Sequence, residues 1–509
     1  MGKRIVVNAG VTETRVAVQE GNLLTELYVE RHARRSIVGS IYKGVVTNVL
    51  PGMQAAFVDI GLHKDAFLYA GDYTANLGED AGELPAGAED DGEPADLALE
   101  EAAARREPRV PIEDVLRKGQ EILVQVSKEP LGSKGARVTS FISLPGRYLV
   151  YMPQARHVGV SRRINDEPER DRLRAAVRAL NPPAGGYIVR TNAEGKGEEE
   201  FAADVEFLGR LWSQVQERCE RVGAPAVLHE ERDLTVRVVR DLLSPEVDEF
   251  LVDSRAVYDK CLDYVRILAP ALAERVRLYE GKAPVFEAQG VEKDIEKALR
   301  RRVWLKSGGY IVIDHTEALV SIDVNTGKYV GKRDFEQTVL KINLEAAGEV
   351  VRQIRLRDLG GIIIIDFIDM EVLEHRGQVE KALKRALNGD KARTNVLAIS
   401  ELGLVEMTRK RVRQDLRSLL SVSCPTCKGT GVIKSDPALA AEIFRAVQAK
   451  VAETDRREII LKVHPDLAGY FDGEGRDGLQ RLAAALDVKV TVQAAAGPVH
   501  REEYELHAR

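Results

Sequence analysis

The sequence is poor in cysteine, in aromatic residues and in long apolar runs. Four cysteines in 509 residues are too few for a disulfide framework and suit a reducing compartment. The amino terminus, MGKRIVVNAG, lacks the apolar run of a signal peptide, and no segment approaches the roughly 18 apolar residues of a membrane span. We therefore expect a cytoplasmic protein with no part in the membrane.

Acidic residues exceed basic ones, but the excess is confined to one segment. The formal net charge is -6, whereas residues 71–110 alone contain twelve Asp or Glu and three Arg. With Pro, Gly and Ala throughout, this stretch predicts a solvated insertion at about residues 72–111. The rest of the chain carries +3, so charge does not exclude a nucleic-acid partner. The length allows several domains.

Two segments flanking this insertion predict a small β-barrel. SIVGSIYKGVVTNVLPGMQAAFVDIGLHKDAFLY and GQEILVQVSKEPLGSKGARVTSFISL contain short β-branched runs separated by Gly and Pro turns. On such a barrel Phe57 and Phe67 can stack on bases while Lys134 follows the phosphates, or the rings can fill the core. The pattern favours neither alternative.

The next segment offers a weaker candidate site. Arg190 and Thr191 end the strand-like GGYIVRT, where a guanidinium and a hydroxyl can bind a phosphate. A solvated strand end is the commoner explanation. Residues 217–280 are helix-rich α/β material whose strand partner is expected at the amino terminus, which predicts a discontinuous domain.

The most informative stretch is GGYIVIDHTEALVSIDVNTG from Gly308, which predicts two strands joined by a tight turn. Period-two alternation puts Asp323 and Asn325 on one face of the second strand, opposite Val320, Ile322 and Val324. A helix from about Phe335 follows, and then the strand GGIIIID, whose four isoleucines predict burial on both faces.

A strand, a crossover helix and a strand form a parallel unit, so Asp323 and Asp366 should lie at neighbouring carboxyl ends. Two close carboxylates repel unless a cation lies between them, which predicts a magnesium site. The alternative makes Asp366 a capping or salt-bridged residue and Asp323 a loop acid. Asp369 is a possible third ligand, but its parity predicts the opposite face.

Basic residues are dense around this unit and suggest a polyanionic substrate, although solvated helix faces explain part of the density. No serine elbow, P-loop or dinucleotide glycine fingerprint occurs in a convincing context, so phosphodiester chemistry is favoured. The residues concerned are Arg352, Arg355, Arg357, Lys384, Arg385, Arg393, Arg409, Lys410, Arg411, Arg413 and Arg417.

SCPTCKGTG supplies half of a metal site. Cys424 and Cys427 have zinc-knuckle spacing, but structural zinc requires four ligands and the sequence has no second such pair. The simplest completion is the same pair from a second chain, which predicts a homodimer with a shared zinc. A redox pair or a merely structural turn are the alternatives. Residues 436–509 predict a small α/β domain.

Together, SIDVNTG, NLEAAGEVVRQIRLRDLGGIIIIDFIDM, LGLVEMTRKR and CPTCKGTG resemble motifs of the ribonuclease E/G family. The amino-terminal ARRSIVGSIYKGVVTNVLPGMQAAFVDIG is most similar to the G branch. The resemblance implies a multidomain α/β fold with these parts: an RNase H-like subdomain (1–36 with 215–278), an OB-fold RNA-binding barrel (37–145), a 5′-phosphate sensor (146–214), a DNase I-like catalytic domain (279–418), a zinc link (419–435) and a small α/β dimerisation domain (436–509).

The same resemblance implies a magnesium-dependent endoribonuclease acting in rRNA 5′-end maturation and mRNA decay. It would cleave single-stranded, AU-rich RNA, prefer 5′-monophosphorylated ends and leave a 5′-phosphate. The implied residues are Asp323 and Asp366 for magnesium, Asn325 for the scissile phosphate, Cys424 and Cys427 for intersubunit zinc, Phe57, Phe67, Lys134 and Arg393 for RNA, and Arg190 and Thr191 for the 5′-phosphate.

The insertion, an alternative function and the oligomeric state bear on this expectation. The acidic insertion is longer than the family pattern suggests and can alter RNA access to the barrel. A non-catalytic RNA-binding protein, such as a ribosome-assembly factor, is the alternative function, and the carboxylate pair separates the two. The shared zinc predicts a dimer, and a dimer of dimers remains open.

Overall fold

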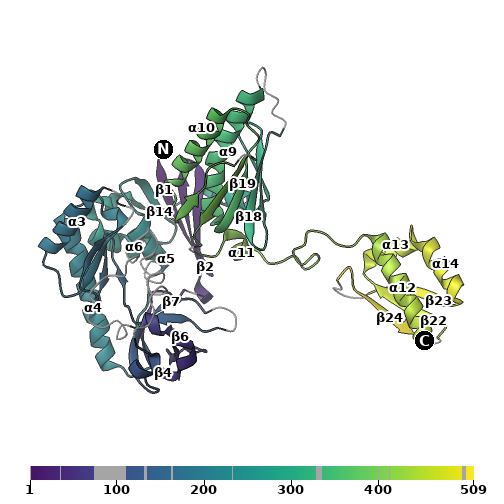
Figure 1. The fold of residues 1–509 in the computed structure, drawn as a ribbon, viewed down its shortest axis with the longest axis horizontal. Coiled ribbons are helices and arrows are strands. Elements are labelled where there is room, and N and C mark those ends of the chain that lie inside the picture. Colours follow the sequence, from purple (N-terminus) through teal and green to yellow (C-terminus); the bar gives the residue numbers. More distant parts are fainter. Residues whose placement is uncertain are drawn as a thin grey trace. The chain divides into compact units, whose positions relative to one another are not determined.

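The computed structural model describes residues 2–34, 36–73, 110–130, 134–161, 164, 166–231, 233–327, 335–400, 402–411, 413–454, 456–495 and 500–509. The chain divides into two compact units, Met1–Arg417 and Ser418–Arg509 (Figure 1). Most of the expected acidic insertion lies outside the described residues. Within the described residues, no helix has both the length and the apolar character needed to cross a membrane.

Five strands of the first unit close into a small barrel, as expected. The order is β4-β5-β6-β8-β7, with β7 pairing back onto β4 and β13 extending the sheet beside β4. Small and branched side chains such as Ala56 and Val58 are fully buried inside it. The strands are β4 (Ile41–Leu50), β5 (Ala55–Asp59), β6 (Ala66–Tyr69), β7 (Glu121–Lys128), β8 (Arg137–Thr139) and β13 (Ala226–His229), and α2 (Ile112–Val115) precedes β7.

A four-stranded sheet with two helices follows the barrel. Its strand order is β11-β12-β10-β9. Aromatic and aliphatic side chains from the sheet and both helices share one core, in which Tyr187 and Phe201 are fully buried. The elements are β9 (Leu144–Pro145), β10 (Leu149–Met152), β11 (Val158–Val160), α3 (Glu167–Ala179), β12 (Gly186–Val189) and α4 (Glu198–Arg221).

A third sheet joins segments that are far apart in the sequence. Its order is β15-β14-β1-β2-β3, and β1 and β14 run parallel with Ile5 opposite Phe250. This pairing brings the amino-terminal strands onto the later α/β segment, as the predicted discontinuous domain requires; the domain boundaries stay a prediction. The elements are β1 (Lys3–Ala9), β2 (Glu13–Glu20), β3 (Leu23–Arg31), α5 (Leu234–Leu242), β14 (Val247–Val252), α6 (Arg255–Leu268) and β15 (Val276–Leu278).

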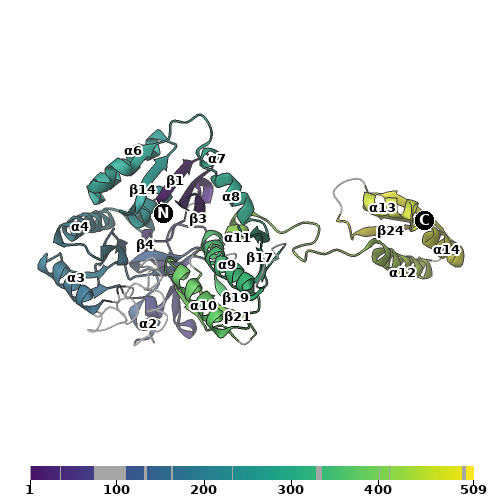
Figure 2. The ribbon, with the colours of Figure 1, turned by 90° about the horizontal axis from the view of Figure 1, so that it is seen from above.

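The fourth sheet carries the predicted carboxylate pair. Its order is β16-β17-β18-β19-β21-β20, and α9 and α10 lie side by side over one of its faces (Figure 1, Figure 2). All neighbouring strands are antiparallel except β18 and β19. The elements are β16 (Arg302–Trp304), β17 (Tyr310–His315), β18 (Leu319–Asn325), α9 (Phe335–Arg357), β19 (Gly361–Asp366), α10 (Leu373–Leu387), β20 (Thr394–Val396) and β21 (Leu404–Arg409), with α7 (Val285–Ala288) and α8 (Val291–Ala298) before them.

The isoleucine strand β19 corrects one expectation. Ile363 and Ile365 are fully buried in the core beneath α9, but Ile362 is 48% exposed and lies on the same face as Asp366. The prediction of burial on both faces was therefore wrong. A largely antiparallel sheet can leave one face open, and four successive isoleucines conceal the alternation. Phe335 likewise begins α9 as expected but is 74% exposed.

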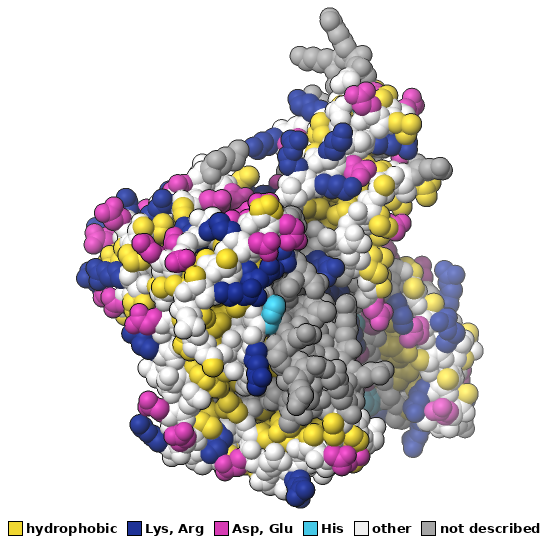
Figure 3. Space-filling view, turned by 60° about the vertical axis from the view of Figure 1, so that its left-hand side comes forward, with side chains coloured by type: hydrophobic (Ala, Val, Ile, Leu, Met, Phe, Trp, Pro, Cys, Tyr) yellow, Lys and Arg dark blue, Asp and Glu magenta, His cyan; other side chains and the backbone are white. Residues whose placement is uncertain are grey.

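Two of the basic residues around this sheet form ion pairs with carboxylates of the same chain. Arg355 pairs with Glu20 and Glu26 of the third sheet, and Arg409 with Asp358 and Asp390, so these cations bind the chain to itself. Figure 3 shows a face on which Lys and Arg side chains are interspersed with Asp and Glu. Arg355 and Arg409 are therefore committed to carboxylates of the chain itself, and the expectation that the remaining basic residues bind a polyanionic substrate stays a prediction.

The second unit is a small α/β domain. Parallel strands β22 and β23 and the antiparallel β24 form its sheet, in the order β23-β22-β24. Its core includes Ile443, Leu461 and Leu467. The elements are α12 (Asp436–Thr454), β22 (Glu458–Val463), α13 (Pro465–Asp472), α14 (Arg476–Leu486), β23 (Lys489–Ala494) and β24 (Tyr504–Ala508). The short helix α11 (Leu416–Leu420) lies at the boundary between the two units.

Candidate active site

Asp323 and Asp366 lie directly opposite each other on adjacent parallel strands. The register of β18 and β19 pairs them as Cα partners at the carboxyl ends of both strands. Both side chains are exposed, whereas the residues next to them along the strands, Ile322, Val324 and Ile365, are buried. Adjacent strands are about 4.8 Å apart, so both carboxylates can approach one small ligand on the open face.

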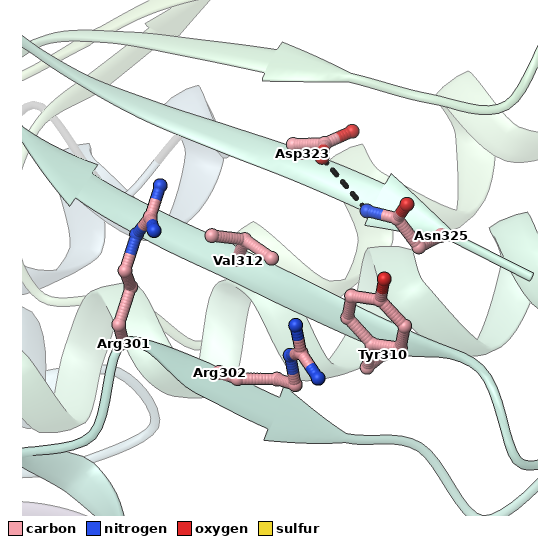
Figure 4. A pocket seen from close by; sticks show the side chains of 6 residues that line it. All are labelled: Arg301, Arg302, Tyr310, Val312, Asp323 and Asn325. Carbon is pink, nitrogen blue, oxygen red and sulfur yellow. Dashed lines mark hydrogen bonds between the residues drawn. The ribbon is translucent and has the colours of Figure 1, made fainter. Parts of the chain in front are cut away.

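Asn325 belongs to the same group. It follows Asp323 by two residues on β18, and its Nδ2 donates a hydrogen bond of 2.7 Å to Asp323 Oδ2 (Figure 4). This contact fixes the orientation of the amide and directs its oxygen away from Asp323. The amide oxygen is then available to a ligand beside the carboxylates.

The electrostatics of the pair indicate unbalanced negative charge. The pKa of Asp366 is raised, first by partial burial and then by the charges of Asp323 and Asp369. The charge of Asp369 therefore reaches Asp366, and the expectation that Asp369 points to the opposite face stays a prediction. The strand ends at Asp366, so strict alternation does not extend to Asp369.

These residues fit a hard divalent cation. Carboxylate oxygens are the ligands that Mg²⁺ prefers, and the ion usually keeps several waters beside one or two carboxylates. Among the residues that the structure describes, no three or more His, Cys, Asp or Glu side chains are grouped as a protein-only metal cage. An open pair of carboxylates with room for water suits magnesium better than a closed structural site.

A pocket beside the pair contains residues that the sequence interpretation missed. It has a volume of about 390 Å³ and is lined by Arg301, Arg302, Tyr310, Val312, Asp323 and Asn325 (Figure 4). The antiparallel register places Val312 opposite Asp323 and Tyr310 opposite Asn325. Alternation along β17 could have placed Tyr310 and Val312 on that face, but the pairing of β16 with β17 required the structure.

Arg393 is not brought to this group. It directly precedes β20, and Thr394 lies opposite Arg409 at the far end of β21. Arg409 in turn pairs with Gly361, at the other end of β19 from Asp366. Gly361 and Asp366 are five positions apart along the strand, a distance of roughly 17 Å. Any contact of Arg393 with RNA would therefore lie away from the carboxylates.

The barrel aromatics lie on its outer face. Phe57 and Phe67 are register partners with ring centroids 5.6 Å apart, and both are half-buried. Tyr69, which the sequence interpretation missed, lies 4.5 Å from the Phe67 ring and is 42% exposed. Lys134 is exposed just before β8, and the Arg137 guanidinium lies 4.8 Å over the Tyr69 ring. An outward aromatic cluster with nearby cations favours base stacking over core filling.

Arg190 and Thr191 lie where β12 ends. Arg190 Nη1 donates to Gly146 O and to Asp241 Oδ1, both at 2.8 Å. The Thr191 hydroxyl lies 3.0 Å from that of Ser161. The two residues are adjacent but already hydrogen-bonded, so a phosphate would have to share Arg190 with Asp241.

The cysteine pair lies in a turn of the second unit. Lys428 N donates to Cys424 O at 2.8 Å, and Lys428, Gly429 and Gly431 have positive φ angles. Backbone N–H groups of Cys427 and Thr426 lower the pKa of the Cys424 thiol. The pair precedes the helices and strands of this unit and does not open a helix after a strand. Zinc binding by this turn stays a prediction.

Residues 143–412 match the model of the Ribonuclease E/G family, and residues 423–509 match that of the RNase E/G, Thioredoxin-like domain. The chain is 43% identical to Ribonuclease G of Escherichia coli (strain K12), and the alignment covers 99% of each chain.

Two further relatives agree. Ribonuclease G of Haemophilus influenzae is 42% identical over 93% of each chain. Ribonuclease E of Escherichia coli (strain K12) is 38% identical over 95% of this chain and 44% of its own length. The matched regions include the open-face carboxylates and the cysteine turn. The chain therefore belongs to the ribonuclease E/G family.

Proposed function

We propose that this protein is an endoribonuclease that cleaves single-stranded RNA at Asp323 and Asp366 and leaves a 5′-phosphate. One observation carries the proposal: two carboxylates face each other at the carboxyl ends of adjacent parallel strands, on a face open to a polymer. The family membership and the names of the relatives, Ribonuclease G and Ribonuclease E, support the same chemistry.

Each residue of the site has a separate task. Asp323 and Asp366 would hold Mg²⁺, which supplies Lewis-acid stabilisation of charge on the scissile phosphate when bound. Asn325, oriented by Asp323, would bind a phosphate oxygen or the attacking water with its amide. The partial burial of Asp366 strengthens the attraction for a cation, because the surrounding dielectric is lower than that of water.

The finer specificity is also part of the proposal. Phe57, Phe67 and Lys134 would bind single-stranded RNA on the barrel, Arg393 would contact it elsewhere, and Arg190 with Thr191 would bind a 5′-monophosphate. Cleavage would favour AU-rich sites, where RNA is most often unpaired. Substrates would include rRNA precursors and mRNA. The assignment of the domains as an OB-fold barrel, a 5′-phosphate sensor, an RNase H-like subdomain and a DNase I-like domain belongs to the same proposal.

The central test is Asp323→Asn. The substitution removes one of the two carboxylates with little change in shape, so cleavage of a fluorescent single-stranded oligonucleotide in Mg²⁺ should fall by at least about a hundredfold. RNA binding, measured by fluorescence anisotropy, should persist.

A matched control is Glu380→Gln on α10, which removes a carboxylate behind the opposite face of the sheet and should leave cleavage unchanged. Cleavage by Asp323→Asn at the wild-type rate would refute the proposed site. RNA binding without cleavage by the wild-type protein, in Mg²⁺ or Mn²⁺, would instead support a non-catalytic RNA-binding role.

A further inference from the structure

We propose that the exposed face of β16 and β17 is a stacking site for one unpaired nucleobase of the substrate, next to the scissile phosphate. The site consists of Arg302, Trp304 and Tyr310. The inference rests on the proposed endoribonuclease function and deepens it, because it names the part of the substrate that this face recognises.

The three side chains form one aromatic and cationic surface. The rings of Trp304 and Tyr310 have centroids 5.2 Å apart at an interplanar angle of 62°. The Arg302 guanidinium lies 4.4 Å from the Tyr310 ring centroid and 5.9 Å from that of Trp304. These edge-to-face and cation–π contacts orient the two rings, and the guanidinium covers one face of Tyr310. The exposed Trp304 ring is therefore the surface on which a base can stack.

Trp304 is unusually exposed for its type. It retains 60% of its accessible surface, although a buried Trp would contribute substantially to stability. The core face of this edge is filled instead by Ile311, which is fully buried, and by Val303, which packs against the same core. The exposed aromatic residue is therefore not needed to complete the core.

The position of this surface identifies its occupant. The pocket lined by Arg302 and Tyr310 is the one that Asp323 and Asn325 also line (Figure 4). The sheet register places Trp304, Tyr310 and Asn325 in one row, and Arg302, Val312 and Asp323 in the next. A base lying on the first row would have its phosphate beside the second.

The charges agree with a nucleotide. Arg301 is paired with Asp314, whereas Arg302 has no carboxylate within ion-pair distance among the described residues. A planar base, a ring face and a cation are the parts of a stacking site that tolerates different bases. A base inside a duplex offers no free face, so this surface selects unpaired RNA.

Fluorescence gives a direct test in the full-length protein. The chain has two tryptophans, so a Trp212→Phe background leaves Trp304 as the only indole reporter. Titration with a single-stranded RNA in buffer without added Mg²⁺, which the proposed cleavage requires, should quench this emission. RNAs with one abasic nucleotide moved along the sequence should lose the quenching at a single position.

Cleavage supplies the second readout. In the wild-type background, Trp304→Ala should lower kcat/KM about 5-fold to 100-fold on the intact RNA, and Trp304→Phe should recover most of the loss. When the abasic nucleotide stands at the position that abolishes quenching, the wild type and Trp304→Ala should cleave this RNA equally slowly. The contact between the base and Trp304 is then missing in both cases.

Three results would overturn the proposal. They are no quenching, quenching that ignores the position of the abasic nucleotide, and additive effects of Trp304→Ala and the abasic nucleotide. A change in native mass on Trp304→Ala without a change in RNA binding would assign this face to a second copy of the chain. The quenching does not require cleavage. If RNA quenches the Trp304 emission but the protein never cleaves RNA, the endoribonuclease proposal is refuted and the stacking site stands.

Discussion

Single residues in this protein take their roles from their neighbours. Burial alone would raise the pKa of Asp241, but Arg240 and Arg190 outweigh it and hold the pKa well below its usual range. Arg190 is thereby fixed at the end of β12 with its guanidinium committed to Asp241 and to Gly146 O. This rigid placement would favour phosphate binding, because little side-chain entropy remains to be lost.

The first residue-scale prediction concerns end recognition. Arg190→Ala should reduce the preference for 5′-monophosphorylated over 5′-hydroxyl RNA by about tenfold, the value of one charged hydrogen bond. The measurement is the ratio of kcat/KM on two oligonucleotides that differ only at the 5′ end.

The control is Arg172→Ala on α3, whose guanidinium pairs with the adjacent Glu169. This variant should keep the wild-type ratio. If Arg190→Ala slows both substrates equally, Arg190 supports the fold and does not bind the terminal phosphate.

At the scale of elements, charged pairs join the third sheet to the crossover helix. Glu26 on β3 accepts a hydrogen bond of 2.8 Å from Arg355 on α9, which also bonds to Glu20. Burial would raise the pKa of Glu26, but Lys391, Arg355 and Tyr28 outweigh burial and lower it well below its usual value. The contact positions the helix that packs beneath β18 and β19.

Glu26→Gln should therefore destabilise the first unit by about 3 kcal/mol at pH 7, because the buried positive charge of Arg355 loses one of its two carboxylate partners. A depressed carboxyl pKa contributes stability above the unfolded value, near 4.5, and loses it as pH falls below that value. Wild-type stability should then decline below about pH 4.5, and the decline should be shallower in Glu26→Gln. Urea unfolding followed by circular dichroism at several pH values measures both effects.

Glu20→Gln is the matched control for this contact. Glu20 bonds to the same arginine, but its side chain is 40% exposed, so solvent screens the pair. The expected loss is under about 1 kcal/mol. Equal losses in the two variants would show that burial does not set the strength of this connection.

At the scale of the whole molecule, the cysteine turn bears on assembly. Cys424 and Cys427 supply two thiols, and the described residues contain no larger group of metal ligands beside them. A tetrahedral zinc requires two more ligands, which a second copy of the turn would provide. Two N–H groups that stabilise the Cys424 thiolate also favour a bound metal.

The double variant Cys424→Ser, Cys427→Ser should lose bound zinc and dissociate to monomers in native mass spectrometry. Chelation of the wild type with EDTA should have the same effect, because the metal would hold the two chains together. Cys219→Ser, which changes a half-buried cysteine on α4, should retain both zinc and assembly. A double variant that remains a zinc-bound dimer would contradict the shared site.

Local sequence determined much of the candidate active site. Period-two alternation placed Asp323 and Asn325 on one face of β18, and a crossover helix of suitable length required a parallel β18 and β19. These rules are local, because they depend on backbone geometry and chain connectivity rather than on distant partners. Register, however, is not local: only the paired sheet sets Asp323 directly opposite Asp366.

Tertiary structure decided which residues are available to a ligand. A run of isoleucines cannot indicate which face a helix will cover, and an arginine cannot indicate whether its carboxylate partner lies on another sheet. The structure exposes Ile362, commits Arg355 to Glu26 and assembles Trp304 with Tyr310 beside Asp323. The sequence by itself determined the chemistry that the chain carries, because residue types and strand periods are local. The fold decided where that chemistry meets solvent, because burial and ion pairing depend on segments distant in the sequence.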